Sequence, residues 1–191
     1  DWVRSATRAV DFIRSTLWKN GRLLATWKDN KGQLNAYLDD YAFLLDGLLE
    51  LMQTTFRQED LDFAIALADV LLDQFEDRET GGFFFTSHDH EKLIHRPKPG
   101  YDNATPSRNG VAAYTLQRMG HLLGAFRYLH AAERTLRLFY PALVRHPDSC
   151  CSLLLALEQW LTAPTVVILR GKANALMRWE NALRQRAPIA L

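Results

Sequence analysis

Residues 38–56 read Leu-Asp-Asp-Tyr-Ala-Phe-Leu-Leu-Asp-Gly-Leu-Leu-Glu-Leu-Met-Gln-Thr-Thr-Phe. The apolar side chains of this run would cover far more than one 100° stripe of a helix, so we expect a helix packed on most of its sides. Apolar residues at three- and four-residue spacing predict further helices before and after it. The predicted helices span residues 3–17, 61–75, 107–119, 122–140, 148–161 and 173–186. We expect breaks at Gly120-His121 and before Pro141.

Two short stretches have a different pattern. Gly81-Gly82-Phe83-Phe84-Phe85-Thr86 places aromatic residues behind a turn signal, which predicts a short β-hairpin inside a long insertion over residues 79–102. Thr165-Val166-Val167-Ile168-Leu169 reads as a strand before the last predicted helix, so the chain should end in a βα unit. A lone strand implies a missing neighbour.

The predicted fold class is therefore mainly α, with antiparallel helical hairpins stacked on one another. A length of 191 residues and a hydrophobic content of 48% predict one folding unit with a sizeable core. We divide it into residues 1–163, which hold the hairpins, and a C-terminal βα extension over residues 164–191.

Charge and composition exclude several classes of protein. The net charge is +1, which offers no field for a polyanion, so we expect no nucleic-acid partner. No apolar stretch approaches the ~20 residues that span a bilayer, and from the residues after Asp1 we expect no targeting peptide in this sequence. The adjacent Cys150 and Cys151 are poorly placed for a mutual disulfide and are expected as reduced thiols, which fits a cytoplasmic location.

The first candidate site is Asp39-Asp40-Tyr41, at the start of the most buried predicted helix. Two adjacent carboxylates in apolar surroundings can raise one pKa and create a general acid. The alternative is that Asp39 or Asp40 caps the helix and offsets its dipole. Residue spacing leaves both interpretations open.

The second candidate site is the polar loop over residues 96–110, which runs into the start of a predicted helix. Ser107 or Thr105 can cap that helix, and its exposed backbone amides could hold a hydroxyl or an anion. The alternative is a rigid loop whose polar groups satisfy each other. Ser87-His88-Asp89-His90 contains metal donors without a second ligand cluster, so we expect no metal and no cofactor.

Several of these motifs occur together in one known family. Leu38-Asp39-Asp40-Tyr41-Ala42-Phe43-Leu44, Gly81-Gly82-Phe83-Phe84, Arg96-Pro97-Lys98 and Ala104-Thr105-Pro106-Ser107 followed by Asn109 stand in the family's order. The chain resembles the uncharacterised thioredoxin-like-domain family that includes a mammalian spermatogenesis-associated protein. Full-length members carry a thioredoxin-like domain followed by an (α/α)6 toroid related to N-acylglucosamine 2-epimerase and six-hairpin glycosidases.

The resemblance implies that this chain is the C-terminal part of a larger protein and holds part of the toroid. It places both candidate sites at the mouth of the toroid's cavity. The implied catalytic residues are Asp39, Asp40 and Asp102, and the implied substrate-binding residues are Tyr41, Arg96, Thr105, Ser107, Arg108 and Asn109. The family has glycine where this chain has Arg108, a cation that could fill the cavity or bind an anionic group.

Two functions follow from this resemblance. In the first, the cavity binds or transforms a carbohydrate, with glycosidase-like or epimerase-like activity residing in the full-length protein. In the second, the helices are a non-catalytic scaffold that serves the thioredoxin-like domain. The expected partners are the rest of the longer protein, a saccharide and a second copy of the chain, because part of a toroid exposes helix faces.

Overall fold

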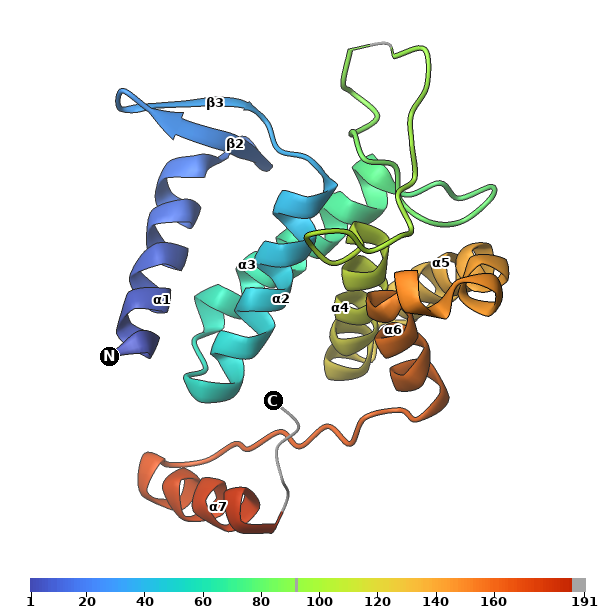
Figure 1. The fold of residues 1–191 in the computed structure, drawn as a ribbon. Coiled ribbons are helices and arrows are strands. Elements are labelled where there is room, and N and C mark those ends of the chain that lie inside the picture. Colours follow the sequence, from blue (N-terminus) through green and yellow to red (C-terminus); the bar gives the residue numbers. More distant parts are fainter. Residues whose placement is uncertain (92, 187–191) are drawn as a thin grey trace.

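The computed structural model describes residues 1–91 and 93–186, and it is mainly helical with one small β-sheet (Figure 1). The first helix, α1 (Trp2–Phe12), continues through a π-helical turn (Ile13–Leu17). It ends before Asn20 and Gly21, which both have positive φ, and the predicted helix over residues 3–17 is confirmed. No described helix is long and apolar enough to cross a membrane.

A three-stranded antiparallel sheet follows α1, where no strand was predicted. Its strands are β1 (Trp18–Lys19), β2 (Arg22–Lys28) and β3 (Lys31–Asn35), in the order β1-β2-β3. Asp29 and Asn30 link β2 to β3 with φ of 52° and 56°, as a two-residue hairpin turn requires. The run Arg-Leu-Leu-Ala-Thr-Trp-Lys of β2 lacks strict alternation, which is why its pattern does not stand out.

The remaining helices form the core. They are α2 (Leu38–Thr54), α3 (Gln58–Val70) with a π-helical turn (Leu71–Phe75), α4 (Arg108–Leu123), α5 (Phe126–Arg145), a 3-10 turn (Pro147–Ser149), α6 (Cys151–Leu161) and α7 (Ala173–Arg186). Short turns join α2 to α3 and α4 to α5, and each pair packs together as a helical hairpin. Helix α4 joins the two pairs, since it also contacts α2 of the first pair, and it contacts α6 as well. The buried side chains of α2 confirm a helix packed on most sides.

Two predicted helix boundaries are wrong. Helix α4 runs through Gly120-His121 and ends at Leu123. The next residue, Gly124, has φ of 64°, the left-handed conformation common after a helix. Gly120 serves packing, since a Cβ there would lie 2.6 Å from Leu129 of α5. Pro141 lies inside α5 rather than after it. It is exposed, as is Arg137, so the carbonyl that loses its helical partner can be hydrated.

The predicted hairpin over residues 81–86 is also wrong, because this segment forms a single bridge between Glu76 and Phe83. The backbone amide of Phe84 donates to Phe75, and that of Phe85 donates to Pro97, so consecutive residues bond to different segments. Gly81 has φ of 83° and approaches α5, where a Cβ would lie 2.5 Å from the carbonyl oxygen of Arg134. The segment is therefore a loop that packs against the helices.

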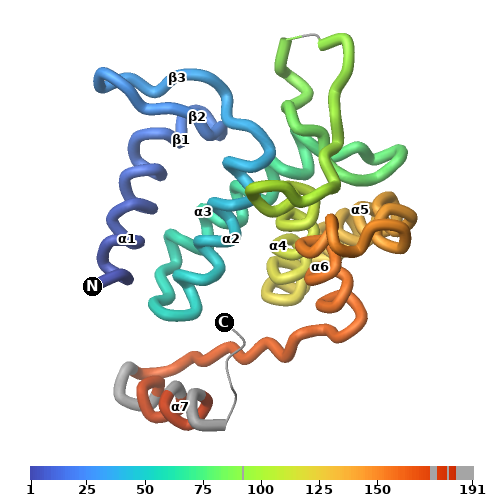
Figure 2. The backbone as a smooth tube through the Cα atoms, in the orientation of Figure 1, coloured from blue at the N-terminus to red at the C-terminus, as the bar shows by residue number. Residues whose placement is uncertain are grey.

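The chain after α6 differs from its prediction in one respect. Residues 163–170 are extended, yet they form no strand with any described residue. Helix α7 confirms the predicted helix over residues 173–186 and lies away from the helical core (Figures 1 and 2). Residues 187–191 of the predicted βα extension lie outside the described residues.

Candidate functional site

Asp40 is part of the start of α2. Its Oδ2 accepts a hydrogen bond of 2.8 Å from the backbone amide of Tyr37, the residue before the helix. Burial raises the pKa of the Asp40 carboxyl; the Tyr37 amide opposes this rise and the neighbouring Asp39 adds to it. The carboxyl thus satisfies a backbone donor at the helix terminus while its pKa lies above the ordinary value.

Asp39 faces a different partner. Its Oδ2 lies 3.2 Å from Nε of Arg108, the first residue of α4. The Arg108 guanidinium lies 5.0 Å from the ring centre of Phe85, and Phe85 stacks on Tyr37 with ring centres 4.8 Å apart. Asp39, Arg108, Phe85 and Tyr37 are each partly exposed. We call these four residues the Asp39–Arg108 cluster.

Tyr41 lies beneath this cluster in the core. Its side chain is fully buried, and its hydroxyl accepts a hydrogen bond of 2.8 Å from the backbone amide of Leu23 in β2. The ring also packs against Phe75. Tyr41 therefore ties α2 to the sheet and presents no surface to solvent.

Asp102 joins the polar loop to α6. Its Oδ1 accepts hydrogen bonds from the Ser107 amide at 2.6 Å and from the Ser152 hydroxyl, while Oδ2 accepts from the Ser152 amide at 2.9 Å. Burial acts to raise the pKa of Asp102, but hydrogen bonds from Ser152 and from backbone amides outweigh it, and the pKa is lowered. Ser107 caps α4 by accepting from the Gly110 amide at 3.3 Å.

Asn109 is fully buried behind this loop. Its Oδ1 accepts from the Phe83 amide at 2.7 Å, and its Nδ2 donates to the carbonyls of Phe83 and Pro99 at 3.0 and 2.9 Å. Every polar atom of this amide side chain therefore has a backbone partner. The contacts hold residues 83 and 99 of the insertion against the first turn of α4.

Arg96 and Thr105 occupy separate places on the insertion. Arg96 donates to the backbone carbonyl of Thr86, and its guanidinium lies 4.1 Å from the ring centre of Phe84. Burial lowers the pKa of Arg96, opposed by the charge of Asp77. Thr105 is exposed, and its carbonyl accepts from the Asn103 amide at 2.9 Å.

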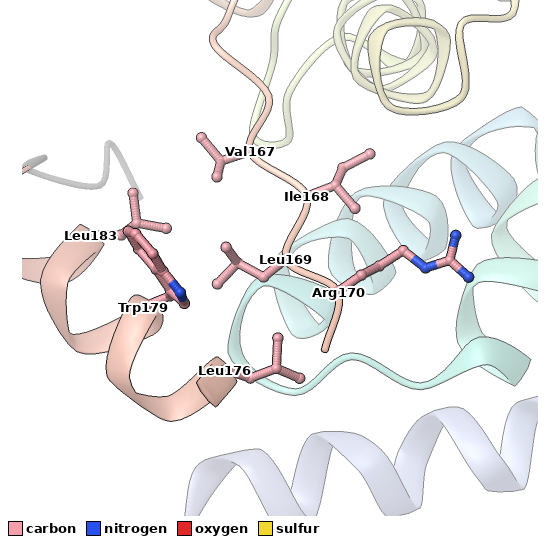
Figure 3. Close-up of a pocket in the computed structure, with 7 residues that line it drawn as sticks. All are labelled: Val167, Ile168, Leu169, Arg170, Leu176, Trp179 and Leu183. Atoms are coloured by element: carbon pink, nitrogen blue, oxygen red, sulfur yellow. The ribbon is translucent and has the colours of Figure 1, made fainter. Parts of the chain in front are cut away.

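Five of the nine predicted site residues thus form two groups that meet at the start of α4. Asp39 and Arg108 form the partly exposed group, whereas Ser107, Asn109 and Asp102 form a group bonded mainly to backbone. None of the predicted site residues lines the pocket of about 410 Å3 beside α7 (Figure 3) or the pocket of about 300 Å3 beside Gly81.

Sequence reasoning missed three residues around these candidates. Tyr37 and Phe85 supply the aromatic stack, and Ser152 supplies two of the three donors to Asp102. No signal in the sequence pointed to Ser152, because it lies four residues inside the predicted helix over residues 148–161 and follows the residue that begins α6 (Cys151–Leu161). Nothing in the local pattern pairs it with a residue 50 positions earlier.

A buried carboxylate lies outside all of these candidates. Asp60 at the start of α3 is fully buried, and it accepts from Arg57 at 2.6 and 2.7 Å and from Arg14 at 2.9 Å. Both arginines also contact Asp11 of α1. Because the charges compensate each other, this network fastens the first helix to α3.

Comparison with known proteins gives matches over most of this chain. It is 30% identical over 178 residues to spermatogenesis-associated protein 20 of Rattus norvegicus, with 87% of this chain and 23% of the relative aligned. The human protein of the same name is 28% identical over the same length, with the same two shares. An uncharacterised protein of Caenorhabditis elegans is 27% identical over 195 residues, covering 97% of this chain and 26% of the relative.

These matches support a family link to spermatogenesis-associated protein 20. No protein-family model matches the chain. The chain spans about a quarter of the length of these curated relatives, 23% of the two spermatogenesis-associated proteins and 26% of the nematode protein. The similarity to spermatogenesis-associated protein 20 therefore concerns one part of a much longer protein.

Proposed function

We propose that this chain is a non-catalytic helical scaffold within a longer protein related to spermatogenesis-associated protein 20. Its helical hairpins would form part of an (α/α)6 toroid and present surfaces to the other parts of that protein. The observation that carries this proposal is the use of Asp40 and Asp102. These two candidate acids accept hydrogen bonds from the backbone amides of Tyr37, Ser107 and Ser152.

The surroundings of the other candidates support the same proposal. Tyr41 and Asn109 are fully buried and bonded to backbone, so a substrate would have to displace structural contacts to reach them. Arg108 is paired with Asp39 and lies over Phe85, where it covers the start of α2. We also propose a cytoplasmic location, supported by the unpaired thiols of Cys150 and Cys151.

A panel of mono- and oligosaccharides tests the scaffold proposal by thermal shift. We expect no sugar to raise the Tm of this chain, and Asp40→Asn to alter Tm equally with and without sugar. A saturable rise in Tm that disappears in Asp40→Asn would contradict the proposal and assign Asp40 to a binding site. The same panel applied to the full-length protein covers a site completed by other hairpins.

A second candidate function is saccharide binding at the Asp39–Arg108 cluster. The observation that favours it is the aromatic stack of Tyr37 and Phe85 beside a partly exposed ion pair, because sugars combine apolar faces with hydroxyls. Any glycosidase-like or epimerase-like reaction would belong to the full-length protein, with Asp40 as the acid whose pKa is already raised.

A matched pair of arginines separates this candidate from the scaffold. Arg118 also bridges α4 to α2, since it lies 2.6 Å from Glu50. Like Arg108 it lies near an aromatic ring, with its guanidinium 5.6 Å from the ring centre of Tyr114. Calorimetric titration with sugars should lose its signal in Arg108→Gln and keep it in Arg118→Gln if the cluster binds saccharide. Equal titrations for both variants and the wild type would reject the cluster as the site.

A further inference from the structure

Asp40 differs from the other carboxylates that the structure shows as buried or half-buried. Each of the others pairs with an arginine or a lysine, as Asp60 does with Arg57, except Asp102, which accepts three hydrogen bonds instead. Within the described residues Asp40 has no such cation, and a single hydrogen bond reaches it, from the Tyr37 amide. Its negative charge is therefore poorly compensated, in agreement with the raised pKa of this carboxyl.

The Asp39–Arg108 cluster does not supply the missing cation. Oδ2 of Asp39 lies 3.2 Å from Nε of Arg108, so these two charges compensate each other. Together with Asp40 they leave one net negative charge beside Tyr37 and Phe85, two stacked aromatic rings that are partly exposed. A carboxylate and the face of an aromatic ring both attract cations. The surroundings of Asp40 therefore favour a positively charged ligand.

Arg108 shows within the chain how a cation is held at this place. Its guanidinium lies beside the Asp39 carboxylate and 5.0 Å from the ring centre of Phe85. Asp40 is a second carboxylate at the next position of α2, and Tyr37, which lies directly before this helix, stacks on Phe85. The first carboxylate thus has its cation, and the second has none within the described part of the chain.

We propose that the ligand of this cluster carries a protonated amine, which binds Asp40 while Arg108 remains on Asp39. The inference rests on the second candidate function, saccharide binding at the Asp39–Arg108 cluster, and narrows its ligand to an amino sugar. One ammonium and one guanidinium balance the charges of the two carboxylates. A sugar acid would add a second uncompensated negative charge, so the cluster should reject it.

Calorimetric titration with three sugars of the same ring measures this preference. Glucosamine carries an amine where glucose carries a hydroxyl, and glucuronic acid carries a carboxylate. At pH 7 and one fixed salt concentration, we expect glucosamine to bind at least about tenfold more tightly than glucose, the effect of a hydrogen bond to a charged group. Glucuronic acid should bind more weakly than glucose, because like charges repel.

Two variants of α2 assign the preference to Asp40. Asp40→Asn removes the charge but keeps an oxygen that can accept from the Tyr37 amide, and it should reduce glucosamine binding to the level of glucose. Asp46→Asn is the matched control, because Asp46 lies on the same helix and burial also raises its pKa, but Nη1 of Arg118 lies 3.4 Å from it. This control should keep the preference for glucosamine. Circular dichroism of both variants verifies that the helices are intact.

The outcomes separate this inference from the function on which it rests. Equal binding of all three sugars, lost in Arg108→Gln, would keep saccharide binding at the cluster and overturn the preference for an amine. No binding of any of the three sugars would overturn both. A preference for glucosamine that persists in Asp40→Asn, or that disappears equally in Asp46→Asn, would reject Asp40 as the residue that receives the amine.

Discussion

Replacing Asp102 should loosen the junction between the polar loop, α4 and α6. Its two carboxylate oxygens receive the Ser107 amide, the Ser152 amide and the Ser152 hydroxyl. Asp102→Ala removes all three acceptor contacts at once. Asp102→Asn keeps the shape and one acceptor oxygen, but it turns an amide nitrogen toward one of the donors and removes the charge.

The expected loss of stability follows from the hydrogen-bond donors that Asp102→Ala leaves without an acceptor. A buried donor without a partner costs about 1–3 kcal/mol. The Ser107 amide keeps a contact of 3.0 Å to the Ser152 hydroxyl, so its share lies at the low end, whereas the Ser152 amide loses its acceptor. We therefore expect about 3 kcal/mol less stability for Asp102→Ala and about 1.5 kcal/mol for Asp102→Asn, with Asp102 partly exposed.

Urea unfolding at pH 7, followed by circular dichroism, measures these differences. Asp148→Ala removes an exposed carboxylate on the neighbouring 3-10 turn and should stay within about 0.5 kcal/mol of the wild type. The lowered pKa of Asp102 means that its ionised form stabilises the fold above its unfolded pKa of about 3.9, and this contribution is lost as pH falls through the folded value. Asp102→Asn should therefore approach the wild type below pH 4. A loss for Asp102→Ala no larger than that of the control would refute the reasoning.

Three further measurements test other contacts. Asp40→Ala should lower the free energy of unfolding by about 1 kcal/mol at pH 7, and Asp40→Asn should lower it less; urea unfolding of both variants decides the order. The raised pKa of Asp40 means that its protonated form stabilises the fold, and this benefit fades as pH rises through the folded value. Tyr128 donates to Asp69, and burial together with this contact raises its pKa to about 12. The part of the alkaline absorbance change that Tyr128→Phe removes should therefore titrate near that value, and a removed part that titrates near 10 would contradict the contact. Asn109→Asp should be at least as destabilising as Asn109→Ala, about 2–4 kcal/mol, because a carboxylate cannot donate to the Phe83 carbonyl; a milder effect of Asp would argue against the assigned orientation of the amide.

Local patterns predicted most of the helices correctly. The apolar spacing of residues 38–56 depends on contacts within one helix and its immediate surroundings, and α2 (Leu38–Thr54) matches it closely. The prediction failed where a residue's local preference was overruled by a neighbouring helix. Gly120 reads as a break in isolation, yet the approach of Leu129 requires a residue without a Cβ inside α4.

The sequence predicted both candidate sites, each with an alternative interpretation. The structure shows which partner each of their side chains contacts. That Asp40 could cap α2 is a local property, since its acceptor reaches the amide of Tyr37 three residues away. The pairing of Asp39 with Arg108 depends on the packing of α2 against α4, which brings residues 69 positions apart to 3.2 Å. Periodicity carries no information about such a distance.

By itself, the sequence determined a mainly helical chain, the order of its helices and the residues able to begin α2 and α4, because these properties depend on neighbours within one or two turns. The tertiary structure decided which donor meets which acceptor. Asp102 binds Ser152 across 50 residues, Asn109 binds Phe83 across 26, and Tyr41 binds Leu23 across 18. Buried polar groups must find partners, and only the packing of distant segments determines which ones lie within hydrogen-bonding distance.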